Sequence, residues 1–190
     1  MGETVKPSTA GKLVPLDVKR TAAISVCERY RYHLTRVWNP NLPMLGWVML
    51  NPSTADAEKD DATIRKCMGF ARRLACGGIS VVNLFAYRTK SPVELKRAAK
   101  QGIDVVGPDN DRFIEEWVKS CPVTIAAWGA HGRFGHRDLK MRLMLRDAAA
   151  PQLYYLRRGM NGVPHHPLYI PYEEADRLLS RALLEDLGPT

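Results

Sequence analysis

Cysteine is scarce in this 190-residue sequence, and its spacing excludes the common metal sites. The four cysteines are Cys27, Cys67, Cys76 and Cys121, so no two have the two-residue separation typical of zinc and iron–sulfur ligands. Buried, reduced thiols are the simpler interpretation. We therefore expect a reducing, cytoplasmic compartment, and we expect no metal or other cofactor.

Long hydrophobic runs are also missing. The longest apolar stretches, such as Leu45–Leu50 and Val123–Trp128, have the length of strands and are far too short to span a bilayer. No apolar run near the beginning resembles a signal peptide. With 45% hydrophobic and 25% charged residues, the composition excludes a disordered or collagen-like chain and predicts a globular domain without a membrane partner.

The charge is strongly positive. There are 28 Lys and Arg residues against 20 Asp and Glu, a formal net charge of +8. A domain this basic is typical of proteins that meet a polyanion, and nucleic acid is the commonest one. The alternative is a basic enzyme with phosphorylated small substrates.

Hydrophobic periodicity predicts one α/β domain at residues 21–190 after a flexible polar arm at residues 1–20. Two alternating strands, Tyr30–Trp38 and Leu45–Leu50, are expected to form a hairpin. The later elements alternate, which predicts a three-layer sandwich with a mostly parallel central sheet. The expected helices are Thr63–Ala75, a short one after the capping box at Ser91, Asp111–Ser120, His136–Ala149 (with Leu139, Leu143 and Met144 on one face) and Glu173–Leu187; the other strands are Ile79–Phe85, Val123–Trp128 and Leu153–Leu156.

Polar residues follow several of these strands. Ligands of parallel sheets bind at the carboxyl ends of the strands, so these side chains are expected to share one cleft. An Asn inside an apolar strand is the most telling of them, because a buried amide needs partners. The groups are Asn51-Pro52-Ser53-Thr54, Asn83 with the downstream Arg88, Trp128-Gly129, and His165-His166-Pro167.

Four of these stretches resemble motifs of the uracil-DNA glycosylase superfamily, in the same order, between about residues 45 and 172. They are Asn51-Pro52, Val81-Val82-Asn83, Ala127-Trp128-Gly129 and His166-Pro167-Leu168. The resemblance implies a glycosylase-like fold with an added N-terminal β-hairpin. It also implies that Asn51 positions an attacking water and that Asn83 reads the edge of a base.

A closer resemblance covers most of the chain. It is to a bacterial and phage family known only as a domain of unknown function, numbered sixteen-forty-three. The similar stretches are Leu50–Asp56, Asp60–Arg65, Asn83–Arg88, Gly107–Asn110, Trp128–Gly132 and His166–Tyr169. The chain departs from the well-studied glycosylases after Pro52, where Ser53 stands in place of Gly or Tyr, and after Pro167, where Leu168-Tyr169 replaces Ser-Pro.

Cleavage of an N-glycosidic bond needs a held water and stabilisation of the departing base. Asn51 can orient a water but cannot remove its proton efficiently, so Asp56, Asp60 or Asp61 would supply a carboxylate. For Asp60 and Asp61, helix capping is the simpler interpretation. His166 is expected to stabilise the departing base, although His165 competes for this role and a structural loop histidine is the alternative.

Substrate contacts are assigned to the neighbours of these residues. Asn83 suits bidentate reading of a base edge, and Phe85 is a candidate for stacking on an extruded base. Phe85 and Trp128 are otherwise ordinary core aromatics, and Arg65 and Arg88 meet either phosphate or solvent. The full expected substrate-binding set is Pro52, Ser53, Thr54, Asn83, Phe85, Arg88, Trp128, Gly129 and Leu168.

A glycine-rich loop after Val123–Trp128 forms a separate candidate. Such a loop exposes backbone N–H groups at a helix start, which favours anions. With Arg65, its residues His131, Gly132, Arg133 and Arg137 are expected to bind phosphate, although a solvated surface is the simpler account of each one.

The sequence therefore predicts a monomeric, DNA glycosylase-like hydrolase that cleaves an N-glycosidic bond of a damaged or modified base, as in DNA repair or base modification. RNA or a nucleotide is an alternative partner. The alternative functions are a non-catalytic base-recognition module, and an enzyme on free nucleotides or in base modification in a phage or defence setting.

Overall fold

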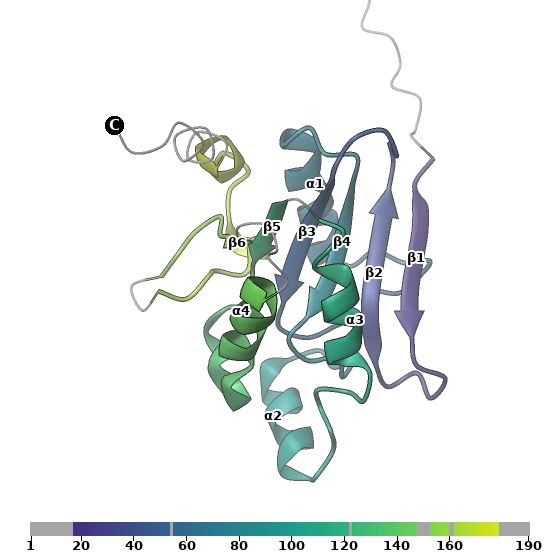
Figure 1. Ribbon diagram of the computed structural model, residues 1–190, viewed down its shortest axis with the longest axis vertical. Helices are drawn as coiled ribbons and strands as arrows, with labels where there is room; N and C mark the ends of the chain where they lie inside the picture. Colours follow the sequence, from purple (N-terminus) through teal and green to yellow (C-terminus); the bar gives the residue numbers. More distant parts are fainter. Residues whose placement is uncertain (1–16, 54, 122, 148–152, 160–161, 179–190) are drawn as a thin grey trace, which may run out of the picture.

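The structure is a computed structural model that describes residues 17–53, 55–121, 123–147, 153–159 and 162–178. Its centre is a six-stranded sheet with the order β1-β2-β4-β3-β5-β6 (Figure 1). The strands are β1 (Lys19–Ile24), β2 (Arg31–Val37), β3 (Met44–Met49), β4 (Gly78–Asn83), β5 (Val123–Ala126) and β6 (Leu153–Tyr154).

The sheet is mixed and mostly parallel. Strands β1 and β2 form an N-terminal antiparallel hairpin, and β2 is also antiparallel to β4. Strands β4, β3, β5 and β6 run parallel to one another. The predicted α/β class is thus confirmed. An N-terminal hairpin is present as well, but it is formed by β1 and β2, and β1 begins at Lys19, inside the arm expected at residues 1–20. Residues 1–16 lie outside the described part.

The predicted hairpin between the strands at Tyr30–Trp38 and Leu45–Leu50 is wrong. Strand β4 lies between β2 and β3, although it comes later in the chain. After β2, the backbone N–H groups of Trp38 and Asn39 both donate to the carbonyl oxygen of Gly77, at 2.9 Å. This leads the connection past the start of β4. Strand β3 is thereby buried between two parallel neighbours, as its apolar run requires.

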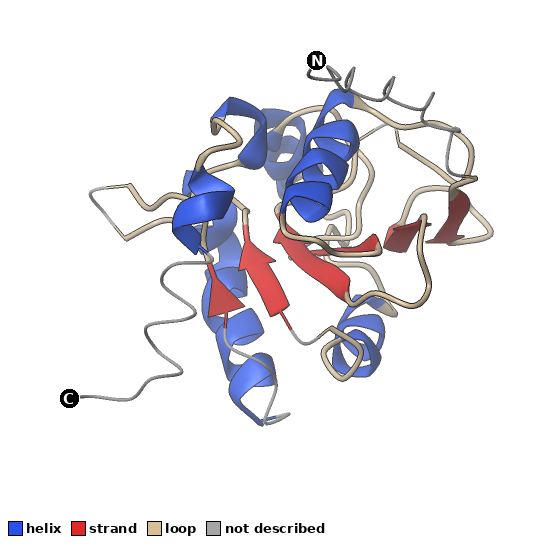
Figure 2. Ribbon diagram, turned by 90° about the horizontal axis from the view of Figure 1, so that it is seen from above, coloured by secondary structure: helices blue, strands red, loops and turns tan. Residues whose placement is uncertain are grey.

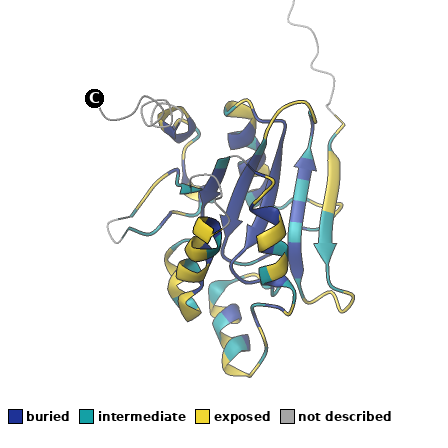
Figure 3. Ribbon diagram, in the orientation of Figure 1, coloured by how far each residue is buried: buried dark blue, intermediate teal, exposed yellow. Residues whose placement is uncertain are grey.

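Helices cover both faces of the sheet (Figure 2). Successive side chains of β3 point to opposite faces of the sheet, so the core has two parts. Trp47 packs with α1 (Ala62–Arg73) and the helical segment 174–178, whereas Val48 packs with the layer on the other face. That opposite layer consists of α2 (Pro92–Lys100), α3 (Asn110–Trp117) and α4 (Arg137–Asp147). Figure 3 shows the central strands buried and the outer faces of α3 and α4 exposed. The expected helix beyond residue 178 lies outside the described residues.

Two helix starts follow the sequence prediction closely. Asp61 caps α1 by accepting a 2.8 Å hydrogen bond from the Ile64 backbone N–H. Ser91 caps α2 by accepting from the Glu94 N–H at 3.2 Å, with Pro92 in the first turn. Both caps stand directly before a helix and fix where each helix begins.

The predicted apolar face of α4 is wrong at Leu139 and Leu143, whereas Met144 is partly buried against the core. Leu139 and Leu143 are 54% and 40% exposed, whereas Met141 and Leu145 are buried. Arg137 lies one turn before Met141 on the same stripe and is buried as well. The buried stripe begins with a charged residue, Arg137, so the hydrophobic pattern of the sequence did not reveal it.

No helix in the described ranges has the length and apolar character that crossing a bilayer requires.

Candidate functional site

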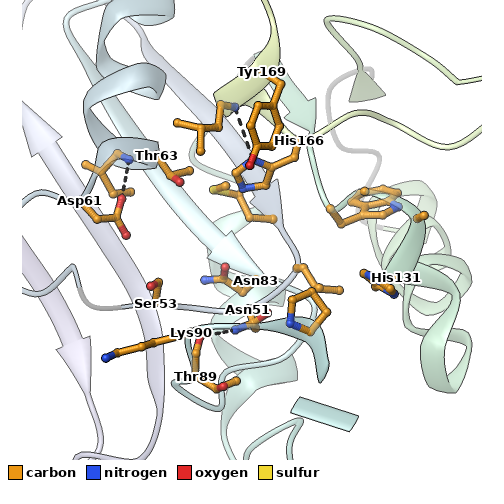
Figure 4. Close-up of a pocket in the computed structure, with 18 of the residues that line it drawn as sticks. Asn51, Ser53, Asp61, Thr63, Asn83, Thr89, Lys90, His131, His166 and Tyr169 are labelled. Carbon is orange, nitrogen blue, oxygen red and sulfur yellow. Dashed lines mark hydrogen bonds between the residues drawn. The ribbon is translucent and has the colours of Figure 1, made fainter. Parts of the chain in front are cut away.

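A cavity of about 540 Å³ lies where β3, β4 and β5 end (Figure 4). The parallel strands bring the segments that follow them to one edge of the sheet, as the sequence predicts. The first turn of α2 and the η2 turn (Pro167–Tyr169) complete the wall. The lining residues are Arg31, Met49, Leu50, Asn51, Ser53, Asp61, Thr63, Ile64, Asn83, Thr89, Lys90, Pro92, Trp128, Gly129, Ala130, His131, His166, Leu168 and Tyr169.

Two buried arginines of β2 hold the loop that leads from β3 to α1. Arg31 donates to the carbonyl oxygen of Ala55 at 2.7 Å. Arg36 donates to the carbonyl oxygen of Asp56 at 2.5 Å and forms an ion pair with Asp60 at 2.6 Å. These bonds fix the loop that carries Asn51, and they place Asp60 in a structural ion pair away from the cavity.

Asn51 is held by its amide nitrogen. Nδ2 donates to the carbonyl oxygen of Thr89 at 2.8 Å and to that of Pro52 at 3.2 Å, and the Thr89 N–H donates back to Pro52 at 3.0 Å. The acceptor Oδ1 has no partner in the described part of the chain. The local bonding therefore leaves an oxygen of Asn51, a cavity-lining residue, to accept a hydrogen bond.

Asn83, the last residue of β4, also lines the cavity, and only 1% of its surface is exposed. Neither Nδ2 nor Oδ1 of its side chain has a hydrogen-bond partner among the described residues. Its backbone, by contrast, is fixed, because Asn110 Nδ2 donates to the carbonyl oxygens of Asn83 at 3.1 Å and Leu84 at 3.2 Å. A buried amide without partners is costly, and a group that offers both a donor and an acceptor would satisfy it.

His166 approaches from the η2 turn. Its Nδ1 accepts from the Leu168 N–H at 3.4 Å, which places the proton of the neutral ring on Nε2. Burial lowers the pKa of His166 below its ordinary value of 6.5, although the negative charge of Asp61 acts in the opposite direction. His166 is therefore a neutral donor at pH 7. His165 is exposed and does not line the cavity, which separates the two neighbours.

Among the three candidate carboxylates, Asp61 alone lines the cavity. Its Oδ1 caps α1, so a single carboxylate combines the capping role with a place on the wall. Asp56 lines a separate hollow and accepts from the Glu58 and Lys59 N–H groups at 2.8 Å each. Those backbone bonds lower the pKa of Asp56.

Several expected site residues lie away from the cavity. Phe85 is buried against Phe134, with 5.6 Å between ring centroids. Arg65 is exposed and donates to the carbonyl oxygen of Asp60. Arg88 donates to the Glu28 carbonyl oxygen at 3.1 Å and lines a neighbouring hollow. Pro52 is buried outside the lining, and Thr54 lies outside the described residues.

The glycine-rich loop forms the turn η1 (Ala130–His136), and only its beginning reaches the cavity. His131 lines the wall, with Nδ1 at 3.3 Å from Lys96 Nζ. Gly132 is needed for packing, since a Cβ atom there would lie 2.1 Å from Trp128 Cδ1. Arg133 is exposed, and Arg137 is buried in an ion pair with Asp111 at 2.6 Å.

Sequence reasoning missed ten lining residues, and five of these have polar side chains: Arg31, Thr63, Thr89, Lys90 and Tyr169. Thr89 and Lys90 directly precede the capping box, and that position was a usable signal, because helix starts after parallel strands face the ligand edge. Tyr169 is 84% exposed and its ring centroid lies 6.4 Å from that of His166. An exposed aromatic at a cavity rim is available for stacking.

No group of three or more His, Cys, Asp or Glu side chains suited to a metal occurs in the ranges that the structure describes.

Comparison with known families places this site in context. The family described as "Protein of unknown function (DUF1643)" matches residues 31–168, a span that includes every lining residue except Tyr169. Comparisons with curated proteins and with solved structures gave no match. Because the matched span covers well over half of the sequence, the chain belongs to the DUF1643 family.

Proposed function

We propose that this protein is a nucleobase-processing hydrolase that cleaves an N-glycosidic bond, with a fold related to that of the uracil-DNA glycosylases. The observation that carries the proposal is Asn83, whose amide is buried on the cavity wall with both polar atoms unpartnered. The edge of a nucleobase offers adjacent donors and acceptors that would satisfy this amide in pairs.

The neighbours of Asn83 supply the remaining requirements of this reaction. Asn51 has an acceptor oxygen for a water, and Asp61 is the carboxylate available to take its proton. His166 has an Nε2 proton to donate to the departing base, which carries negative charge as the bond breaks. Figure 4 shows Asn51, Asn83 and His166 around the same space. Tyr169 at the rim offers a face for stacking.

Recognition of a base without cleavage is the second candidate. Asn51 provides an amide beside the water, where a stronger base would remove the proton more effectively. One oxygen of Asp61 already accepts the hydrogen bond that caps α1. A recognition module would keep the pocket and its Asn83 but would need no carboxylate.

A cleavage panel tests the proposal. Purified protein is incubated with labelled single- and double-stranded oligonucleotides that contain uracil, hypoxanthine, xanthine, a mismatch or a bulky thymine derivative, and with the corresponding nucleotides. Hot alkali reveals abasic sites, and chromatography reveals free base. We expect release of one base, lost in Asn51→Ala and His166→Ala and retained in His165→Ala, the matched control.

Binding without release of a base, weakened by Asn83→Ala, would favour the recognition module. Release that persists in both Asn51→Ala and His166→Ala would contradict the assigned site.

A further inference from the structure

Arg31 is a buried cation that forms no ion pair with the described residues, although the negative charge of Asp61, on the same wall, acts against the lowering of its pKa by burial. Its surface is 3% exposed, and its one hydrogen bond runs from a guanidinium nitrogen to the Ala55 carbonyl oxygen at 2.7 Å. Nε is buried and has no partner, and no carboxylate of the described residues forms an ion pair with it. Burial lowers the pKa of Arg31 to about 10, so the side chain keeps its charge at neutral pH.

The other two buried arginines show what is missing at Arg31. Arg36 is paired with Asp60, and Arg137 is paired with Asp111, each at 2.6 Å. Both lie outside the cavity lining, whereas Arg31 forms part of it. A buried charge is strongly disfavoured unless it is paired, so an unpaired one on a cavity wall indicates that the partner is a ligand.

The surroundings of Arg31 support an anion. Lys90 adds a second cation at the exposed rim, and Ser53 adds a hydroxyl group, whereas the Thr89 hydroxyl already donates to Glu94 at 2.6 Å. Asp61 is the one carboxylate on the described wall, and its Oδ1 is occupied by the Ile64 N–H. The described part of the wall thus has two side chains that are positively charged at neutral pH, Arg31 and Lys90, and one carboxylate, Asp61.

From this we infer that Arg31 binds the phosphate monoester of a free nucleotide that enters the cavity whole. The orientation of its base toward Asn83 rests on the proposed function, whereas the phosphate subsite stands on Arg31 alone. A cavity of about 540 Å³ lies within the range of sites that enclose small ligands.

Nucleic acid is the other source of phosphate, and the position of Arg31 argues against it. The diester groups of a strand stay at the surface, where Arg29 and Arg88 line a neighbouring hollow. That hollow shares Ser53, Thr89 and Lys90 with the cavity. The phosphates of a nucleic-acid strand would pair with these outer arginines and leave the positive charge of Arg31 without an ion-pair partner.

Calorimetric titration at constant ionic strength tests the inference. The probes are uridine, uridine monophosphate, inosine, inosine monophosphate, inorganic phosphate and a short uracil-containing oligonucleotide. We expect a monophosphate to bind about tenfold or more tightly than its nucleoside, because hydrogen bonds to charged groups are strong. Arg31→Gln should remove this preference, so that the nucleoside and its monophosphate bind with similar affinity.

Two further variants keep the result interpretable if Arg31→Gln folds poorly. Lys90→Gln, at the exposed rim, should weaken monophosphate binding without altering nucleoside binding. Arg29→Gln, in the outer hollow, should change neither.

The inference is overturned if no phosphate probe binds, if nucleosides and monophosphates bind equally, or if Arg31→Gln keeps the preference. It is also overturned if only the oligonucleotide binds and Arg29→Gln weakens it. Tight monophosphate binding without any release of base would leave the phosphate subsite standing and contradict the proposed hydrolase.

Discussion

The side chain of Asn110 donates to the backbone carbonyl oxygen of Asn83 at 3.1 Å, while the side chain of Asn83 itself has no partner in the part of the chain that the structure describes. Both residues are buried. The side-chain amide of Asn110 therefore holds the end of β4 in place, whereas the side-chain amide of Asn83 is free to bond to a ligand in the cavity.

This contrast predicts opposite effects of the same substitution. Asn83→Leu should raise the free energy of unfolding by about 1–3 kcal/mol, because it replaces an unsatisfied buried amide with an apolar group of similar size. Asn110→Leu should lower it by about 1–3 kcal/mol, since the carbonyl oxygens of Asn83 and Leu84 each lose a hydrogen bond from Asn110, although that of Leu84 keeps the one from Arg137 Nε. Urea unfolding measures both. A loss of stability in Asn83→Leu equal to that in Asn110→Leu would mean that the Asn83 amide is bonded in the folded protein.

The protein should lose stability as the pH falls below neutrality. Burial lowers the pKa values of His166 and His33, so the unfolded chain binds protons more readily than the folded protein does. The stabilisation is complete above the ordinary pKa of 6.5 and is lost as the pH falls through 6.5 toward the lower folded values. Thermal unfolding between neutral and mildly acidic pH should show this decline.

Substitution of one histidine assigns the effect. The decline should be shallower in His166→Ala than in the unsubstituted protein, whereas His165→Ala should leave it unchanged. An NMR titration of His166 with a midpoint above 6.5 would contradict the buried, neutral ring.

The β3–α1 loop should depend on Arg36. Arg36→Met removes the 2.6 Å ion pair with Asp60, which keeps only the more exposed Arg20 at 3.8 Å, and it also removes the bond to the Asp56 carbonyl oxygen. We expect a loss of about 3–5 kcal/mol, as is usual when one member of a buried pair is removed. The exposed pair of Arg112 and Glu116 provides the control, and Glu116→Ala should cost at most about 1 kcal/mol. Equal effects of the two changes would show that Arg36 does not organise the loop.

Gly132→Ala should disturb the cavity wall. The new methyl group would meet the Trp128 ring, and such overpacking costs about 1–3 kcal/mol. Trp128 lines the cavity, so its fluorescence should change together with ligand binding. Gly135→Ala is the comparison: its φ of 58° imposes backbone strain, but nothing lies closer than 4.0 Å to its Cβ position, so Trp128 should stay in place. An unchanged Trp128 signal in Gly132→Ala would refute the packing role.

Local sequence patterns predicted which segments form helices and which form strands, and they predicted much of the candidate site. The apolar runs Leu45–Leu50 and Ile79–Phe85 predicted two strands of a mostly parallel sheet, and parallel strands place the residues that follow them at one edge. The caps at Asp61 and Ser91 were predicted for the same local reasons.

What the sequence concealed depended on distant partners. Strand β4 pairs with β2 across the position that a local hairpin would occupy, and no turn residue signals such a pairing. Arg31 and Arg36 belong to a strand that was predicted from its alternation, and nothing in that pattern indicated that these two charged residues would be buried. Their partners, the carbonyl oxygens of Ala55 and Asp56, are backbone atoms that no sequence pattern reveals.

The most direct test of the account is whether the side-chain amide of Asn83 contacts a nucleobase. Its Nδ2 proton signals can be assigned by NMR through their loss in Asn83→Asp. Titration with free uracil, hypoxanthine, xanthine, cytosine and adenine, alone and as nucleotides, should shift these signals for at least one base, while the bonded amide of Asn110 moves less. Saturable binding of a nucleotide that leaves the Asn83 signals in place, or no response to any of these compounds, would contradict the claim that this cavity reads a base.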